Sequence, residues 1–469
     1  MTDLDATLNR NPPGVLDAPF AAASVGMLAL ISILAFEQLA VATVMPGVAA
    51  ALNGSSLYAA AFGAAVAAGI AGMVAAGHWC DRAGPSAPLT VGAAAFSLGL
   101  VLAGVAPDMT LLVLGRALQG GGGGLMSVAL YVVVGRYYPS ALHPRIFAAF
   151  AGAWVVPAIV GPAVAGLIAR HLGWRWVFLA AAVLTVPALL LLQRGLAQFA
   201  TGLSSRAVPT TAATSTTTPA RREIVAAIAT AVCAALLYAG GQALDLRALL
   251  LAMVALCGLA IFAPRLLPAG SLHAAQGLPA VVALRGLVAA NFFTAEVFLP
   301  LLLTTERGLS PVQAGLVLTL GALGWSAGSW YQGREGRARD DAACVRRLRA
   351  GLAMMGAGTL IVTLALLPAL PLPVAVAGWL LAGVGIGLVY PTLSVLALRF
   401  APPEQQGRAS SALQLSDSLF SAVGLALASA VLGAVQPLSP RAAFAAGLAL
   451  AAALSLAGVM VASRARRAV

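Results

Sequence analysis

The sequence predicts an all-α membrane protein with about fourteen transmembrane helices. Hydrophobic residues make up 61% of the chain and charged residues 9%, whereas charged residues are about 25% of an ordinary soluble domain. The mean hydropathy is +0.95. A chain of 469 residues with this composition cannot cover its apolar surface with polar side chains. Its solvent is therefore expected to be lipid.

The apolar stretches fall into three groups along the chain. The first group lies at 22–50, 56–78, 88–106, 109–135, 144–170 and 175–194. Two stretches follow at 223–241 and 247–264, and the last group lies at 281–305, 310–332, 347–368, 372–399, 408–434 and 440–462. A bilayer core needs about 20 apolar residues per helix. The pattern therefore predicts two six-helix bundles and two extra central transmembrane helices.

These groups divide the chain into six expected segments. They are a cytoplasmic N-terminal tail (1–20), an N-terminal six-helix bundle (21–195), a cytoplasmic linker (196–222), two extra transmembrane helices (223–265), a C-terminal six-helix bundle (266–463) and a basic cytoplasmic tail (464–469). The linker is predicted to be disordered because its Ser, Thr, Ala and Pro residues offer little apolar surface to bury.

The positions of the 27 basic residues, all of them arginine, predict the orientation. An N-terminus inside the cell leaves about twenty arginines on the cytoplasmic side and about five outside, as the positive-inside rule requires. An even number of spans returns both termini to the cytoplasm. We expect a multi-pass protein of a bacterial inner membrane, that is, a plasma membrane. The net charge of +12 then needs no nucleic-acid partner to explain it.

The connection between the second and third stretches carries a recognisable signature. Its sequence, Gly77-His-Trp-Cys-Asp81-Arg82-Ala-Gly84, resembles the G-x-x-x-D-R-x-G loop of the major facilitator superfamily. Two uncharged residues follow where that family usually continues with basic ones. The resemblance implies a conformational-switch loop, whose acid and arginine can bind a neighbouring helix end and bias the balance between inward-open and outward-open states.

Further stretches resemble the same superfamily. The fourth contains its R-x-x-Q-G element from Arg116 onward, and the fifth is similar to the G-P-x-x-G-G core associated with antiporters, with Ala165 in place of one glycine. The segment from Glu37 to Pro46 resembles a signature of the fourteen-helix drug:proton antiporter branch, with Glu for Asp. Helix packing or bending is expected of Gln119, Gly120, Pro157, Gly161, Pro162 and Gly166.

Three acidic residues lie within the apolar stretches: Glu37, Glu296 and Asp417. A carboxylate at mid-bilayer is costly when it is ionised and unpaired, so it can take up and release a proton as its access changes sides. Asp417 is closer to one end of its stretch, and either a place near the cytoplasmic mouth or a bond to the second stretch is open to it. All three are candidates for proton coupling or substrate binding.

Arg116 stands inside an apolar stretch and needs a partner or a cavity. It is expected to be a fixed charge near an acid or part of a proton relay, with binding of an anionic substrate as the alternative. Glu37 is accordingly either a proton or cation site or the structural partner of Arg116. Candidates to line a substrate cavity are Gln38, Asn291, Phe292, Phe293, Trp154, Trp325 and Tyr390, although aromatic residues near span ends also serve as interfacial anchors.

The resemblance implies a proton-coupled exporter of amphipathic, hydrophobic or cationic compounds, with two pseudo-symmetric halves and alternating access. A dedicated exporter or importer of one metabolite, lipid or siderophore on the same fold is the alternative. The spans contain no His/Asp cluster or G-x-S-x-G context, and no G-x-x-x-x-G-K-[ST] motif occurs, so neither an enzyme, a metal site nor a nucleotide-driven pump is expected. The expected partners are a small-molecule substrate, protons and the lipid bilayer. The protein is expected to be a monomer and to need no cofactor.

Overall fold

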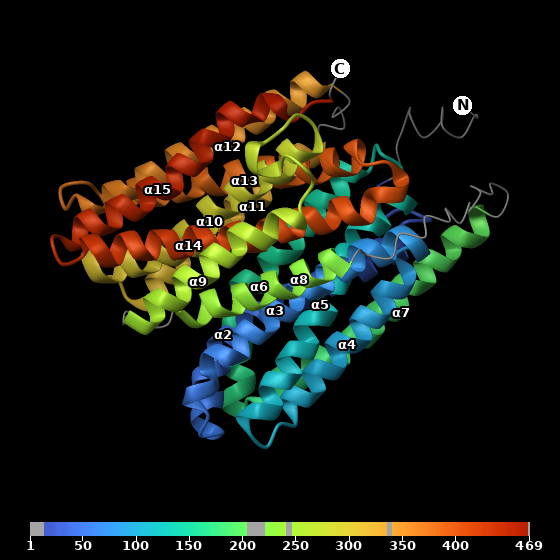
Figure 1. Ribbon diagram of the computed structural model, residues 1–469, viewed down its shortest axis with the longest axis horizontal. Coiled ribbons are helices and arrows are strands. Elements are labelled where there is room, and N and C mark those ends of the chain that lie inside the picture. Colours follow the sequence, from blue (N-terminus) through green and yellow to red (C-terminus); the bar gives the residue numbers. More distant parts are fainter. Residues whose placement is uncertain (1–13, 204–220, 241–245, 335–339, 468–469) are drawn as a thin grey trace. The chain divides into compact units, whose positions relative to one another are not determined.

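The computed structural model describes residues 14–203, 221–240, 246–334 and 340–467. These residues form fourteen α-helices, α2 to α15, and no β-strand (Figure 1). The all-α fold is as predicted, because each predicted apolar stretch corresponds to one helix. The apolar stretches form helices since a membrane-spanning segment must satisfy its backbone hydrogen bonds internally.

The first six helices are α2 (Ala21–Ala51), α3 (Tyr58–Ala83), α4 (Ser86–Gly104), α5 (Met109–Tyr137), α6 (His143–His171) and α7 (Arg175–Leu203). The middle pair is α8 (Arg221–Gly240) and α9 (Leu246–Phe262). The last six are α10 (Leu278–Arg307), α11 (Pro311–Arg334), α12 (Asp341–Thr363), α13 (Leu372–Phe400), α14 (Gln406–Val435) and α15 (Pro440–Val461). The expected linker, 196–222, is helical at both ends rather than disordered there, and its residues 204–220 lie outside the described part of the chain.

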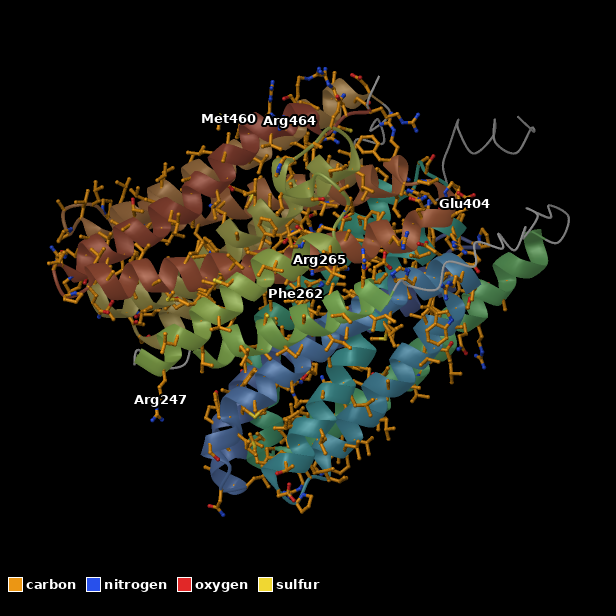
Figure 2. All side chains as sticks on the ribbon, in the orientation of Figure 1. Arg247, Phe262, Arg265, Glu404, Met460 and Arg464 are labelled. Atoms are coloured by element: carbon orange, nitrogen blue, oxygen red, sulfur yellow. The ribbon has the colours of Figure 1, made fainter. Side chains whose placement is uncertain are left out.

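In the described residues, eleven helices are long and apolar enough to cross a membrane by length and composition. The helices α8, α9 and α11 fall outside that set; α9 has only 17 residues. Charged side chains gather at helix ends, and Figure 2 shows Arg247 projecting from the first turn of α9. At the other end of this helix the Arg265 guanidinium lies 5.2 Å from the centroid of the Phe262 ring. The chain is a multi-pass membrane protein.

The chain forms two compact units, which we describe separately. Unit 1 comprises Met1–Ala231 and Ala401–Ser411, and unit 2 comprises Val232–Phe400 and Ala412–Val469. The boundary between them falls inside α8 and inside α14. The first turns of α14 therefore belong to unit 1, and the rest of that helix belongs to unit 2.

In unit 1, α5 packs between α3 and α4 at backbone contact. Gly120 on α5 faces the backbone carbonyl of Ala65 on α3, and Gly122 faces the backbone of Phe96 on α4. A Cβ atom at either glycine would overlap those atoms. The glycine run in this helix therefore permits a close approach on two sides.

In unit 2, α13 holds the same position between α11 and α12. Gly383 faces the backbone of Gly321 on α11, and Gly385 faces the backbone carbonyl of Gly351 on α12. Glycine at these positions again lets three helices meet without intervening side chains.

The glycines of α6 do not behave as expected. A Cβ at Gly166 would meet no atom within 4 Å, and one at Gly161 would lie at an ordinary 3.6 Å from the Phe36 ring. The tight helix approach expected of these two residues is therefore absent from the described structure. Pro157 and Pro162 lie inside α6, which continues as a helix through both.

Candidate functional site

A buried ion pair connects α2 and α5 in unit 1. Arg116 donates hydrogen bonds to the Glu37 carboxylate and, at 2.5 Å, to the side-chain oxygen of Gln119. Its Nε atom also donates to the backbone carbonyl of Ala61 on α3 at 3.4 Å. Glu37 and Arg116 are only 6% and 5% exposed. The structure thus makes Glu37 the partner of Arg116, one of the two roles that the sequence had left open.

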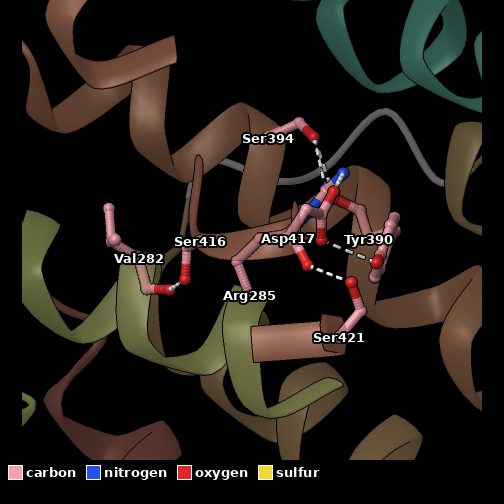
Figure 3. Close-up of polar contacts among 7 residues, drawn as sticks. All are labelled: Val282, Arg285, Tyr390, Ser394, Ser416, Asp417 and Ser421. Atoms are coloured by element: carbon pink, nitrogen blue, oxygen red, sulfur yellow. Dashed lines mark hydrogen bonds and ion pairs between the residues drawn. The ribbon is translucent and has the colours of Figure 1, made fainter. Parts of the chain in front are cut away.

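A second ion pair, with a buried arginine and a partly buried acid, connects α10 and α14 in unit 2. Arg285 Nη2 donates to Asp417 Oδ2 at 2.7 Å, and the Tyr390 hydroxyl donates to Asp417 Oδ1 at 2.7 Å (Figure 3). The Arg285 guanidinium lies 3.5 Å from the centroid of the Tyr390 ring and also donates to Ser394 Oγ at 3.2 Å. One guanidinium, one carboxylate and one phenol therefore form a single network across three helices.

Short contacts hold α14 in place beside this network. Ser416 Oγ donates to the Val282 carbonyl on α10 at 2.7 Å, whereas Ser421 Oγ donates within α14 itself, to the Asp417 carbonyl at 2.7 Å (Figure 3). A Cβ at Gly286 on α10 would overlap the Phe420 side chain of α14. The partner of Asp417 thus lies on α10 and not on the second span, which the sequence had allowed.

Arg285 is a site residue that the sequence analysis missed. Its side chain is buried, with 3% of the residue exposed. The available signal was an arginine at the eighth residue of α10, within an apolar stretch, where its charge needs a partner. A search for intramembrane arginines as well as acids would have found it.

Aromatic side chains form a continuous row next to the Asp417 network. The Tyr390 ring packs edge-on against Trp325 at 5.2 Å between centroids, and Trp325 packs edge-on against Phe292 at 5.2 Å. Phe292 also stacks on Trp379 at 4.8 Å and contacts Phe293 at 5.9 Å. Four of these five were cavity candidates, and Trp379 was not.

The other polar candidates of α10 differ in their surroundings. Asn291 is fully buried; its amide donates to the Ala451 carbonyl at 2.7 Å and accepts from the Thr359 hydroxyl at 3.3 Å. It therefore ties α10 to α15 and α12. Glu296 is half-buried one turn after Phe292 and Phe293, and no described residue forms a hydrogen bond or ion pair with its carboxylate.

Two further cavity candidates lie apart from these clusters. Gln38 follows Glu37 on α2 but its side chain is exposed, and Trp154 on α6 is 38% exposed. Neither has a described contact with a charged candidate residue. The structure therefore brings together only part of the predicted cavity set.

The predicted switch loop binds the beginning of α14 within unit 1. Asp81 accepts hydrogen bonds from the backbone N–H groups of Gly407 at 2.6 Å and Arg408 at 3.1 Å. A Cβ at Gly77 would lie 2.8 Å from the Ser411 side chain, so glycine there permits the approach. Gly84 ends α3 with a φ of +79°, a conformation that favours glycine. Asp81 therefore caps the first turn of α14.

The sequence matches a family model over most of its length. Residues 25–425 match the model described as Major Facilitator Superfamily.

This chain belongs to the major facilitator superfamily.

It is 27% identical over 432 residues to a probable multidrug-efflux transporter of Mycobacterium tuberculosis, covering 87% of this chain and 86% of the relative.

Solved structures of other superfamily transporters share the fold. A human organic anion transporter superposes with a TM-score of 0.67 at 14% identity, covering 95% of this chain and all of the other chain. A proton:xylose symporter gives a TM-score of 0.64 at 15% identity, covering 94% of each chain. A bacterial homologue of the iron transporter ferroportin, in an outward-facing state, gives 0.65 at 14% identity, covering 94% and 97%.

In this superfamily transporter, two of the three acids within the membrane-spanning helices are paired with an arginine. Arg116 neutralises Glu37 and Arg285 neutralises Asp417, whereas Glu296 has no basic partner among the described residues. The chemistry left available is proton or cation binding at Glu296 and rearrangement of the two pairs.

Proposed function

We propose that this chain is a proton-coupled exporter of amphipathic, hydrophobic or cationic compounds, an antiporter that works by alternating access. The observation that carries the proposal is Glu296, a half-buried carboxylate in the membrane-spanning helix α10 without a described partner. An ionised carboxylate in such a place is costly, so binding of either a proton or a cation relieves the same cost. Competition for one group is what couples two opposite fluxes.

The surroundings of Glu296 favour an amphipathic substrate. Phe292 and Phe293 precede it by about one turn on the same helix, and Phe292 continues into the aromatic row. Aromatic faces bind apolar and cationic groups, and the unmatched carboxylate adds attraction for positive charge. The name of the mycobacterial relative, a probable multidrug-efflux transporter, supports the same substrate class.

The Arg285–Asp417 network is proposed as a second coupling element. Protonation of Asp417 would remove the charge that Arg285 Nη2 and the Tyr390 hydroxyl now bind, and would free the guanidinium that lies over the Tyr390 ring. Because Tyr390 begins the aromatic row, such a change would reach the proposed substrate-binding side chains directly.

The test is efflux of ethidium, a lipophilic cation, from proteoliposomes with an imposed proton gradient. Glu296→Gln removes the charge but keeps the shape, and we expect gradient-driven efflux to fall at least about tenfold while ethidium binding persists. Glu404→Gln, an exposed acid on the short helix η5 (Pro403–Gln405), is the control and should transport as the wild type does.

The other outcomes separate the remaining hypotheses. Efflux that survives Glu296→Gln but is lost in Glu37→Gln or Asp417→Asn would move the coupling role to a paired acid and contradict the role of Glu296. A wild type that moves no cationic or lipophilic compound, but carries one metabolite, lipid or siderophore, would replace the exporter proposal with the dedicated transporter.

A further inference from the structure

A single carboxylate joins the first extra helix to two other helices of unit 1. Glu223 lies in the first turn of α8, and its Oε2 atom is 3.3 Å from His78 Nε2 on α3. Its Oε1 atom accepts from Arg408 Nη2 on α14 at 3.4 Å. The Glu223 side chain is only 32% exposed and the His78 side chain 16%. The sequence analysis gave none of these three residues a role.

Arg408 is held at two points by two different helices. Its backbone N–H donates to Asp81 on α3, and its guanidinium donates to Glu223 on α8. His78 and Asp81 are three residues apart on α3 and so share a helix face. The carboxylate of Glu223 therefore contacts both helices that the Asp81 bond joins: α3 through His78 and α14 through Arg408.

The charges around this contact explain why an acid is needed there. Arg82 follows Asp81, and Arg136 approaches closely enough to donate to the Cys80 carbonyl at 2.9 Å. Arg408 adds a third positive charge at the same end of α3. Glu223 offsets this accumulation through its bond to the half-exposed guanidinium of Arg408.

We use the word latch for the bonds of Asp81 on α3 to the N–H groups of Gly407 and Arg408 on α14. We propose that Glu223 is a positioning residue that makes α8 the third component of this latch. Its carboxylate lies beside His78 and binds the Arg408 guanidinium, and thereby keeps the first turn of α14 on Asp81. On this view the extra central helices do more than connect two groups of six helices, because α8 controls the release of α14 from α3. The inference depends on the proposed transport cycle only for its effect on transport, since latch release can be measured without substrate.

Backbone amide exchange provides that measurement. The N–H groups of Gly407 and Arg408 lie in the first turn of α14, where backbone donors have no acceptor within the helix, so their protection reports the bonds to Asp81. In the purified full-length protein, Glu223→Gln should speed hydrogen–deuterium exchange at these two amides by about three- to tenfold.

Two comparisons make the result specific. Glu404→Gln removes the same charge from an exposed residue near α14 (Figure 2) and should leave both amides at the wild-type rate. Arg408→Gln should match Glu223→Gln, and the double substitution should add little to either alone, because both remove one shared contact.

Two results would overturn the proposal: unchanged exchange in Glu223→Gln, or a Glu223→Asp variant that fails to speed the two α14 amides alone. Wild-type exchange at Gly407 and Arg408 in Glu223→Gln would show that the carboxylate does not hold the latch. Should amides throughout α5 also lose protection, the substitution has unfolded unit 1, and Glu223→Asp then decides. That variant keeps the charge but shortens its reach, and it must speed the two α14 amides alone.

Discussion

In each of the two intramembrane ion pairs, the acid and the arginine respond differently to the loss of the other. A carboxylate left without its arginine can accept a proton and become neutral, whereas a guanidinium remains charged at every pH at which the protein is folded. Removing Glu37 or Asp417 should therefore cost more stability than removing the arginine that each one pairs with. This asymmetry follows from the chemistry of the two groups and not from the geometry of either pair.

Glu37→Leu should accordingly destabilise the protein more than Arg116→Leu. We expect about 3–5 kcal/mol for the loss of the acid, which leaves a buried guanidinium unpaired, and about 1–3 kcal/mol for the loss of the arginine. The double substitution should be milder than Glu37→Leu alone. Thermal unfolding in detergent measures all three variants, and a greater loss for Arg116→Leu would contradict the argument.

At the residue scale the sequence located the acids but not their partners. Glu37, Glu296 and Asp417 stand out because charge is rare in apolar stretches. Pairing depends on which helix faces which, information that hydropathy does not carry. Hydropathy therefore leaves the partnership of Glu37 with Arg116 open and does not single out Arg285. Nor does it predict the bonds of Asn291 to α15 and α12.

Among the helices, α5 and α13 have the same place in their units, each between two neighbours at backbone contact. The sequence predicted both helices because an apolar run of about 20 residues suffices for that. It predicted packing through glycine in α6 as well, where the structure leaves room. A glycine pattern shows where close approach is permitted, and only the tertiary structure shows where it occurs.

Gly120→Ala and Gly166→Ala test this difference with the same chemical change. At Gly120 the added methyl group would overlap the Ala65 carbonyl, so we expect a loss of about 1–3 kcal/mol in stability. At Gly166 there is open space, and the better helix propensity of alanine should leave stability unchanged or raise it by up to about 1 kcal/mol. Thermal unfolding in detergent compares them; equal losses would refute the assignment of close contact to α5.

For the whole molecule, the unequal distribution of arginine is the basis of the expected orientation. The ends of α3 and α5 carry Arg82 and Arg136, which lie together in unit 1, and this end is expected to face the cytoplasm. The connection between α2 and α3 lies three helices away from the one between α5 and α6. These two connections must therefore face opposite sides of the membrane.

Cysteine labelling in intact cells tests the orientation. With the exposed Cys257 replaced by serine, Ser56→Cys in the connection after α2 should react with a membrane-impermeant maleimide added outside. Ser140→Cys, in the connection after α5, should react only after the cells are permeabilised. The reverse pattern would invert the topology, and labelling of both before permeabilisation would contradict the predicted span count between them.

The cap on α14 also has a consequence for synthesis on the ribosome. Asp81 binds amides that lie 326 and 327 residues further along the chain. At translation rates of about 5–20 residues per second, the acid waits about 16–65 s for them. The helices α4 to α7 are synthesised during that time, but unit 1 also includes Ala401–Ser411 and so becomes complete only near the end of translation. A chain that terminates before Gly407 leaves the end of α3 without its partner.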